Sequence, residues 1–519
     1  MAGKQNPQEK TSEANESDLI AQRKQKLKNL IDRGVEPYPY SFQKKNNARE
    51  LLAKYKDLKN DERVKGNFSV AGRVMTLRVM GKAGFMHIQD QTGKIQVYAR
   101  EEEVGEDSYK TFSKLDLGDI VGVEGEIFRT KLGEVSIWAK KVTILTKSLL
   151  PLPEKWHGLK DKEIRYRRRE LDLICNPEVL ETFRKRSAII SAMREFLDSR
   201  GFLEVEIPTL QPVYGGAEAR PFITHLNELD MKVFLSISPE LYLKRLIVGG
   251  YDKVYTICKN FRNEGIDRTH NPEFTMMECY AAYEDYNYVM KLTEEMYAYI
   301  AKKVLGTTKI KYKDKEIDLT PPWPRLTVKE GLKKYGKLDV DKLKDKELFD
   351  LVEEHKIDLK GKKLTRGIAI MLLFEELVEE HLTGPVFAID YPREASPLCK
   401  QKRGDPQLIE KVEPYINGWE SGNGYSELNN PLIQRELLND QAKQLREGNE
   451  EASPMDEDFA KAIELGMPPT AGLGIGVDRM VIILTNSDSI RDVIPFPFMK
   501  RLDDTSEENT EKKDNSSRK

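Results

Sequence analysis

One stretch of this 519-residue chain decides its fold, FRNEGIDRTHNPEFTMMECY, residues 261–280. Its two ends are strand-like, and alternate residues of a strand share one face. Phe274, Glu278 and Tyr280 therefore project to the same side. The pattern predicts a hairpin whose other strand brings Arg262 to that face. Such a mixture of charge and aromatic rings on one sheet face is costly to bury without a ligand.

The predicted loop of this hairpin, residues 263–272, adds Glu264, Arg268 and His270 above the same face. The guanidinium of Arg262 is a planar fork that suits carboxylate or phosphate oxygens. A phenylalanine ring offers a flat surface on which a base can stack. The segment therefore favours a binding site for an anion that carries a base. The alternative is an internal ion-pair network.

A second segment gathers acids and amides in the same way, EPYINGWESGNGYSELNN, residues 413–430. Glu413 and Glu420 flank a predicted turn at residues 417–418. Carboxylates without a partnering base nearby in the sequence indicate Mg²⁺, which prefers one or two carboxylates together with phosphate oxygens. Three further side chains share strand parity after the turn: Asn423, Tyr425 and Glu427.

The third segment is AGLGIGVDRMVIILTNSDSIRDVIPFP, residues 471–497. Gly472, Gly474 and Gly476 alternate along a predicted strand, which indicates that another group packs flat against the backbone. Arg479 then opens a helix beside that surface. The spacing is not G-x-G-x-x-G, and the chain has no Walker A motif, so dinucleotide-binding and P-loop folds are excluded.

Residues 67–146 have a different texture, with short β-branched strands separated by glycine-containing turns. This spacing predicts a small closed barrel, either an OB-fold or another barrel of similar size. The remainder, residues 177–502, alternates antiparallel-looking strand pairs with helices and predicts an α+β domain. Its helices are expected at residues 177–200, 284–304, 327–335, 341–355 and 365–382.

The other segments connect or flank these two domains. Residues 17–66 predict a helical extension that begins with a basic helix, either an ordinary surface helix or one that contacts nucleic acid. Residues 147–176 read as a linker, after which Asn176 is expected to cap the next helix and Pro177 to begin it. Two polar tails are expected to be disordered, residues 1–16 and 503–519.

Composition sets broader limits. The formal net charge is −2, so any nucleic-acid contact must come from local patches. Four cysteines lie far apart with no C-x-x-C pair, which favours free thiols in a reducing compartment. No stretch approaches 18 uninterrupted apolar residues, and the polar, acid-containing start is unlike a signal peptide. These features together predict a cytoplasmic protein without a membrane span.

The three charged segments, in this order, resemble a known family. FRNE with HNPEF resembles motif 2 of the class II aminoacyl-tRNA synthetases, GLGIGVDR resembles motif 3, and GFLEVEIP with the helix before it resembles motif 1. The class I signatures HIGH and KMSKS are absent. Four segments are similar to the lysyl-tRNA synthetases in particular: GGAEARPFITH, SPELYLKRLIVGG, EFTMMECYAAYEDY and ESGNGYSELN. The resemblance covers residues 17–500.

The resemblance implies an α+β fold, with an N-terminal OB-fold β-barrel followed by a class II catalytic domain on an antiparallel sheet with flanking helices. It implies ATP-dependent activation of L-lysine and transfer of the lysyl group to tRNA(Lys), with Arg262 and Arg479 as the catalytic residues. Mg²⁺ would bind Glu413 and Glu420. The nucleotide would contact Arg262, Glu264, His270, Phe274, Glu420 and Arg479.

The resemblance also implies a lysine pocket. Its acids Glu240, Glu278 and Glu427 suit an ammonium-bearing side chain, although Glu427 paired with a neighbouring Arg or Lys is an alternative. A class II synthetase for aspartate or asparagine is a second alternative, and a non-catalytic RNA-binding paralogue is a third. The lysine-binding set is Gly215, Glu240, Arg262, Glu278, Tyr280, Asn423, Tyr425 and Glu427.

Two further expectations concern partners. The barrel face would read the tRNA anticodon through Arg78, Phe85, Gln96 and Glu134. A homodimer would form through the helix that begins at Pro177, because that helix carries a long apolar stripe; packing of the stripe against the chain's own core is the alternative. The stripe is Val179, Phe183, Ile190, Met193 and Leu197.

Overall fold

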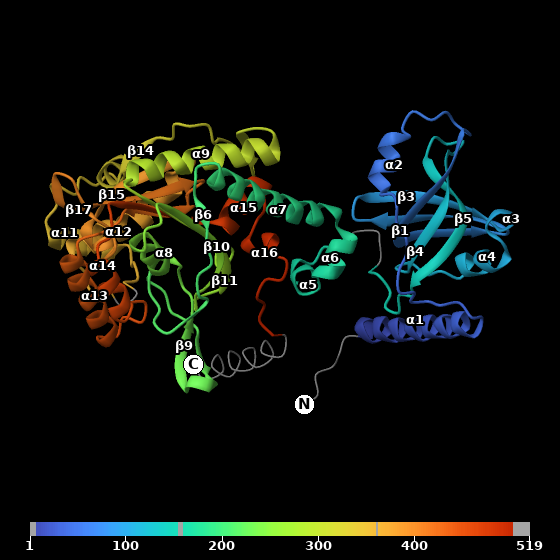
Figure 1. Cartoon of the computed structure of the whole chain (residues 1–519), viewed down its shortest axis with the longest axis horizontal. Helices are drawn as coiled ribbons and strands as arrows, with labels where there is room; N and C mark the ends of the chain where they lie inside the picture. The colour runs from blue at the N-terminus through green and yellow to red at the C-terminus, as the bar shows by residue number, and fades with distance from the viewer. Residues whose placement is uncertain (1–6, 154–158, 360–361, 502–519) are drawn as a thin grey trace. The chain divides into compact units, whose positions relative to one another are not determined.

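The computed structural model describes residues 7–153, 159–359 and 362–501. The chain forms two compact units that divide between Gly158 and Leu159, and each is described by itself (Figure 1). The predicted C-terminal tail and the first six residues lie outside the described part of the chain. Within that part, no helix has the length and apolar character needed to cross a membrane.

The first unit contains the predicted barrel. Five strands close in the order β1-β2-β3-β5-β4, which is the closed five-stranded barrel of an OB-fold. All neighbours are antiparallel except β3 and β5, which run parallel. The strands are β1 (Arg63–Met80), β2 (Ala83–Asp90), β3 (Gly93–Arg100), β4 (Ile120–Arg129) and β5 (Val135–Thr146).

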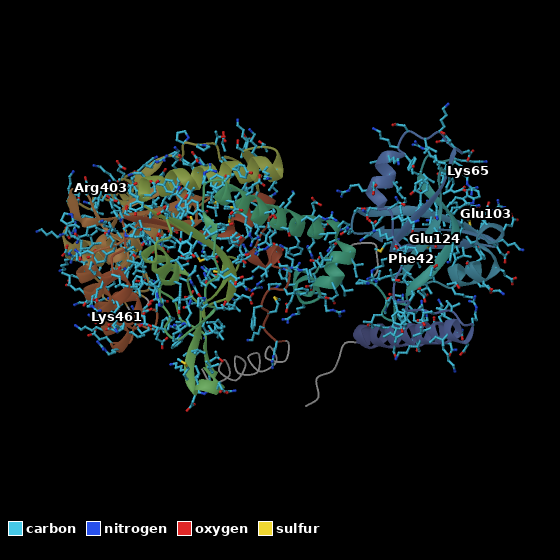
Figure 2. All side chains as sticks on the ribbon, viewed as in Figure 1. Phe42, Lys65, Glu103, Glu124, Arg403 and Lys461 are labelled. Carbon is cyan, nitrogen blue, oxygen red and sulfur yellow. The ribbon has the colours of Figure 1, made fainter. Side chains whose placement is uncertain are left out.

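Alternation along the strands separates the barrel core from its outer face. On β2, Met86 and Ile88 are buried in the core, whereas the residues that alternate with them, Phe85 and His87, lie on the outer face. Gly122 of β4 has a side chain packed directly against it, which leaves no space for a Cβ atom. A Cβ at Gly122 would lie 2.4 Å from the ring of Phe42, which packs on the strand (Figure 2).

Four helices complete the first unit: α1 (Pro7–Asp32), α2 (Ala48–Lys54), α3 (Glu101–Val104) and α4 (Glu106–Ser113). The basic helix α1 begins ten residues before the expected start at Ser17 and overlaps the predicted N-terminal tail. Two of its basic side chains bind the barrel unit itself. Arg23, only 8% exposed, donates to the carbonyls of Leu117 and Leu150, and Lys26 pairs with Asp116.

The second unit is built on one large sheet of order β14-β15-β17-β19-β20-β11-β10-β6. Its pairs are antiparallel except at the two ends, β14/β15 and β10/β6, as an α+β domain predicts. The strands of this unit are β6 (Leu203–Glu204), β7 (Leu210–Gln211), β8 (Ile223–Leu226), β9 (Met231–Leu235), β10 (Lys253–Phe261), β11 (Glu273–Ala282), β12 (Lys309–Tyr312), β13 (Lys315–Asp318), β14 (Arg325–Thr327), β15 (Val386–Pro392), β16 (Gln401–Lys402), β17 (Asp405–Ile416), β18 (Trp419–Glu420), β19 (Gly422–Ser426) and β20 (Thr470–Gly476).

Helices cover both faces of this sheet, and the expected helices are found close to their predicted bounds. They are α5 (Lys162–Arg167), α6 (Arg169–Cys175), α7 (Pro177–Asp198), α8 (Glu240–Val248), α9 (Tyr286–Leu305), α10 (Val328–Gly331), α11 (Asp345–Glu354), α12 (Arg366–Leu377), α13 (Pro431–Arg446), α14 (Glu457–Glu464), α15 (Val477–Thr485) and α16 (Ile490–Val493).

Two apolar cores lie on opposite sides of the sheet. Side chains of α7, α9 and α15 pack with Met277 and Cys279 of β11 in one core. Those of α8 and α12 pack with Tyr280 in the other. Because neighbouring residues of β11 point to opposite faces, Glu278 and Tyr280 lie on the side that also carries α8.

The apolar stripe of α7 is divided. Met193 and Leu197 are fully buried in the chain's own core, whereas Phe183 and Ile190 are only partly buried in this chain. Asn176 differs from the expectation, because its amide does not cap α7. It donates to Asp172 Oδ1 at 2.7 Å instead.

The expected linker is divided between the two units. Lys147 is buried against Asp119 in the barrel unit. In the second unit, Asp172 at 0% exposure accepts hydrogen bonds from Arg165 and Arg169 as well as from Asn176. Residues 159–176 are thus a packed part of the second unit, held by a buried carboxylate with three donors.

Candidate functional site

A cavity of about 410 Å³ lies on the α8 side of the large sheet. Side chains from all three charged segments line it, together with residues from α8 and from the segment before it. Every residue predicted to bind a ligand in this unit lines the cavity, except Glu413. The predicted residues that line it are Gly215, Glu240, Arg262, Glu264, His270, Phe274, Glu278, Tyr280, Glu420, Asn423, Tyr425, Glu427 and Arg479.

One part of the cavity is cationic and aromatic. The predicted hairpin is confirmed, with β10 and β11 antiparallel and residue 260 opposite Phe274. The guanidinium of Arg262 lies 5.1 Å from the centre of the Phe274 ring, and Arg262 Nε is buried without a hydrogen-bond partner in the described chain. Arg479, at the start of α15, donates to the carbonyl of Glu420 at 2.6 Å. Two neighbouring arginines, one of them beside a ring, suit an anionic ligand with a base.

The loop of the hairpin is ordered by its own aspartate. Asp267 accepts hydrogen bonds from the backbone N–H groups of Thr269 and His270 and lies 2.8 Å from His270 Nδ1. Burial opposes ionisation, but these hydrogen bonds outweigh it and lower the pKa of Asp267 to about 2. Arg268 is exposed and does not line the cavity. Its carbonyl accepts from the N–H of Ile490.

The other part of the cavity is acidic. Glu240, Glu278 and Glu427 are each at most 4% exposed. Glu278 accepts hydrogen bonds from Ser238 Oγ at 2.9 Å and from the Tyr280 hydroxyl at 3.1 Å. Burial and then the charge of Glu240 raise the pKa of Glu278 to about 8, against the opposing effects of Ser238, Tyr280 and Arg262. Three carboxylates crowded out of water form a site that favours a cation.

Glu427 has a cationic neighbour that the sequence interpretation did not single out. Its Oε2 lies 2.5 Å from the ammonium of Lys244, and Lys244 also lies 2.6 Å from Glu240 Oε1. The alternative pairing of Glu427 with a lysine is therefore present in the structure. Glu427 nevertheless lines the cavity, and its Oε1 has no hydrogen-bond partner among the described residues. That oxygen remains available to a ligand.

Gly472 forms the surface against which this acidic end is built. A Cβ at residue 472 would lie 1.9 Å from Glu427 Oε1 and 2.5 Å from a ring carbon of Tyr280. The flat packing predicted from the alternating glycines is therefore confirmed at this position. It also shows that Glu427 and Tyr280, both members of the predicted lysine-binding set, meet over one point of β20.

Glu413 and Glu420 lie on two paired strands, β17 and β18, joined by the predicted turn at residues 417–418. Burial and then the charge of Glu413 raise the pKa of Glu420. Such mutual repulsion fits a cation site. However, a base does lie nearby, since Lys411 pairs with Glu413 Oε1 at 2.8 Å. The sequence interpretation overlooked this lysine, two residues away on the same strand.

Tyrosines complete the surroundings of Glu413. Tyr391 and Tyr415 both donate to its Oε2, at 2.5 and 3.0 Å. Burial opposes ionisation of Glu413, but Lys411 and these donors lower its pKa. Glu413 thus remains a carboxylate behind the cavity wall, whereas Glu420 lines the cavity itself.

A separate candidate surface lies on the barrel. Strand register places Arg78 opposite Phe85, Phe85 opposite Tyr98, and His87 opposite Gln96. Gln96 donates to Glu134 Oε2 at 2.7 Å. The rings of Phe85 and Tyr98 are 4.6 Å apart. The four predicted residues therefore lie on one outer face, and the structure adds His87 and Tyr98, which alternation along β2 and β3 would have identified.

Comparison with known proteins agrees with both parts of this description. Residues 161–500 match the family described as "tRNA synthetases class II (D, K and N)", and residues 68–145 match the "OB-fold nucleic acid binding domain". The first match alone spans more than half of the chain. Barrel, sheet and cavity are thus found together in the order that the class II resemblance predicted.

Relatives with high sequence identity show which family of class II synthetases the chain belongs to. A lysine–tRNA ligase of Pelotomaculum thermopropionicum is 52% identical over 93% of this chain and 95% of the relative. Lysine–tRNA ligases of Clostridium novyi and a Thermoanaerobacter species are 50% and 51% identical over 95% of this chain, and over 96% and 98% of those proteins. The chain therefore belongs to the class II tRNA synthetases and, within them, to the family of the lysine–tRNA ligases.

The raised pKa of Glu278 predicts a pH effect on stability. The folded chain holds this proton up to about pH 8, whereas an unfolded glutamate loses it near its ordinary pKa of about 4.3. Stability from this group is present at low pH and is lost as pH rises through that window. Because Glu278→Gln stays neutral, its melting temperature relative to the unsubstituted protein should rise between pH 5 and pH 9.

Differential scanning calorimetry of the ligand-free protein measures this difference. Glu273→Gln, at an exposed position of the same strand, is the matched control and should follow the unsubstituted protein at every pH. Parallel curves for Glu278→Gln and the unsubstituted protein would contradict the assignment of a protonated Glu278.

Proposed function

We propose that this chain activates L-lysine with ATP and transfers the lysyl group to the 3′ end of tRNA(Lys). The observation that supports this most directly is the polarity of the cavity. Arg262 lies beside the ring of Phe274 in one part, which Arg479 also lines, and three buried carboxylates lie in the other. Lysine has one carboxylate and two ammonium groups, and ATP has a triphosphate and a base, so the two substrates match the charges of the two parts.

The residue types fit the chemistry of amino-acid activation. A carboxylate oxygen of the substrate is already a nucleophile, so its attack on the α-phosphorus of ATP, with pyrophosphate as leaving group, needs no general base. It needs alignment and neutralisation of charge. Arg262 lies in the cationic part, close enough to Glu278 for their charges to interact, and would contact both the amino-acid carboxylate and the α-phosphate. Phe274 would stack on adenine, and Arg479 would cover its other face and reach the γ-phosphate.

The remaining nucleotide contacts come from the loop and the turn. Glu264 and His270 would contact the nucleotide above the sheet, with His270 held in place by Asp267. Glu413 and Glu420 would hold Mg²⁺, and the raised pKa of Glu420 beside Glu413 supports that donor set. When bound, the ion would supply positive charge to the phosphate oxygens.

The alternative amino acids fit less well. An aspartate or asparagine pocket would need a cation facing the side chain of the substrate. Lys244 and Lys411 are cations near this site, but each is already paired with glutamate, and Lys244 does not line the cavity. A non-catalytic role is disfavoured because both arginines and both candidate metal ligands are present.

An ATP–pyrophosphate exchange assay across the twenty amino acids tests this proposal. We expect exchange with lysine alone at micromolar to millimolar amino acid. The control is Arg262→Lys, which keeps a charge but loses the bidentate fork and should reduce exchange by at least about tenfold. Exchange with aspartate or asparagine, or with no amino acid, would contradict the proposal.

We propose that the outer face of the barrel binds the anticodon of tRNA(Lys). The face offers an arginine, a half-buried aromatic pair and a polar network of Gln96, His87 and Glu134. Aromatic rings stack on bases, and amides and carboxylates read base edges. A cytoplasmic location accords with a reaction of translation and with four cysteines that are all free thiols.

Phe85→Ala tests the anticodon assignment. Stacking of one base on one aromatic ring contributes about 1–3 kcal/mol. The substitution should therefore raise the tRNA KM of charging at least about fivefold and leave ATP–pyrophosphate exchange unchanged. Tyr40→Ala is the matched control, because Tyr40 is a fully exposed aromatic residue of the same unit. Equal loss in both assays would contradict the assignment.

We also propose a homodimer, supported by a surface other than the α7 stripe. The sheet β7-β9-β8 and the turn after it expose large apolar side chains: Leu210 by 52%, Ile223 by 59%, Leu226 by 37% and Leu229 by 65%. Leu210 and Leu226 lie opposite Leu235 and Met231 of β9, which have the same strand parity, so these two side chains share one face of the small sheet. Two-fold pairing is the commonest way to bury such a patch.

Sedimentation equilibrium at micromolar concentration measures the mass directly. We expect twice the chain mass of 59.7 kDa. Leu210→Asp should shift the mass toward that of one chain, because a charge cannot be buried unpaired. Leu465→Asp is the matched control at another exposed apolar position. A fully active protein of 59.7 kDa would refute the dimer.

A further inference from the structure

Lys244 is a fully buried cation directly behind the acidic end of the cavity. It lies on α8, four residues after Glu240, so both side chains emerge on the same face of the helix. Its side chain is 0% exposed and does not line the cavity. Lys244 therefore cannot contact a ligand itself. Any effect on the ligand must pass through the carboxylates that it touches.

Those carboxylates belong to two elements that the chain brings together from a distance. Lys244 Nζ is 2.6 Å from Glu240 Oε1 on α8 and 2.5 Å from Glu427 Oε2, which follows β19. The second oxygen of Glu240 accepts from the Tyr425 hydroxyl at 2.8 Å. The second oxygen of Glu427 has no hydrogen-bond partner in the described chain. Lys244 thus fixes one oxygen of each carboxylate and leaves Glu427 Oε1 free.

Several ionisable groups face this pair from the surrounding elements. Burial raises the pKa of Glu427, as do the charges of Glu240 and Glu278, and Lys244 opposes that rise. For Lys244 itself, burial lowers the pKa, but Glu240 and Glu427 more than offset it, so its pKa is raised and it stays charged. The groups that face the pair are Glu240, Glu278, Tyr280, Cys399 and Tyr425.

The formal charges show how Lys244 changes the net charge at the acidic end of the cavity. In the ligand-free chain Glu278 holds its proton up to about pH 8, so the charges of Glu240 and Glu427 face those of Lys244 and Arg262. Ionisation of Glu278 when lysine binds would leave one net negative charge, which opposes the net positive charge of free lysine, with two ammonium groups and one carboxylate. Without Lys244, two like charges in a dry site would remain, and one carboxylate would take up a proton instead.

We propose that Lys244 is a positioning residue of the amino-acid pocket: its ammonium clamps Glu240 to Glu427 and presents Glu427 Oε1 to an ammonium group of the substrate. This inference rests on the proposed activation of lysine. Lys244, although it lies outside the cavity, would then contribute to the selection of an amino acid with two ammonium groups.

Two neutral substitutions test it, Lys244→Met and Lys244→Gln, with Arg245→Met as the matched control. Arg245 is the next residue of α8 and is exposed, so the control removes a positive charge from the same helix outside the pocket. Wild-type exchange with lysine is measured first, because failure of the proposed function would show there. The KM for lysine, the KM for ATP and kcat are then measured from pH 6 to pH 9, together with the melting temperature.

We expect both neutral variants to raise the lysine KM at pH 7 at least about tenfold, with the ATP KM within about threefold. The lowest lysine KM should shift to higher pH, because Glu427 loses the neighbour that favours its ionised form. Arg245→Met should show neither change. The inference is overturned if a folded neutral variant keeps the wild-type lysine KM and pH profile. It is also overturned if neither variant folds, or if lysine and ATP parameters decline together, since Lys244 would then only stabilise the fold.

Discussion

The carboxylate of Asp478 joins three segments that are far apart in the sequence. It pairs with Arg186 of α7 at 2.6 Å and accepts the backbone N–H of Thr275 on β11 at 2.7 Å. All three residues are buried. Asp478 also immediately precedes Arg479, so the position of one arginine of the cavity depends on this contact. A buried ion pair with a further donor is strongly directional, because any movement leaves charge unpaired.

The cavity follows from this arrangement. β11 and β20 are held side by side, with Glu278 opposite Gly474 and Tyr280 opposite Gly472. Large polar side chains on one strand face glycines on the next, which leaves room for a ligand between the sheet and α8. Charge in this space is sorted by distance along the strands, with arginine near the loop and carboxylates deeper in. The positions of the charged side chains that would bind the two substrates therefore depend on the register between β11 and β20.

Sequence reasoning identified most of this site because strand parity is easy to read. Arg262, Phe274, Glu278 and Tyr280 do share a face, and the alternating glycines do pack flat. It missed Lys244 and Lys411, although Glu240 and Lys244 have the i, i+4 spacing of a helical ion pair. A lysine in a helix is usually exposed, and only the tertiary structure shows these two lysines to be buried. The predicted side-chain cap of Asn176 was wrong for the same reason, since periodicity does not name the donor or acceptor that a side chain meets.

A single substitution at Gly472 would change the shape of the cavity. The end of the amino-acid pocket is shaped by the hydrogen of a glycine, where a methyl group would collide with Glu427 and Tyr280. Glycine and alanine codons differ by a single base. The length of the cavity at its acidic end thus depends on the absence of a methyl group at residue 472, and a single-base change would introduce that group.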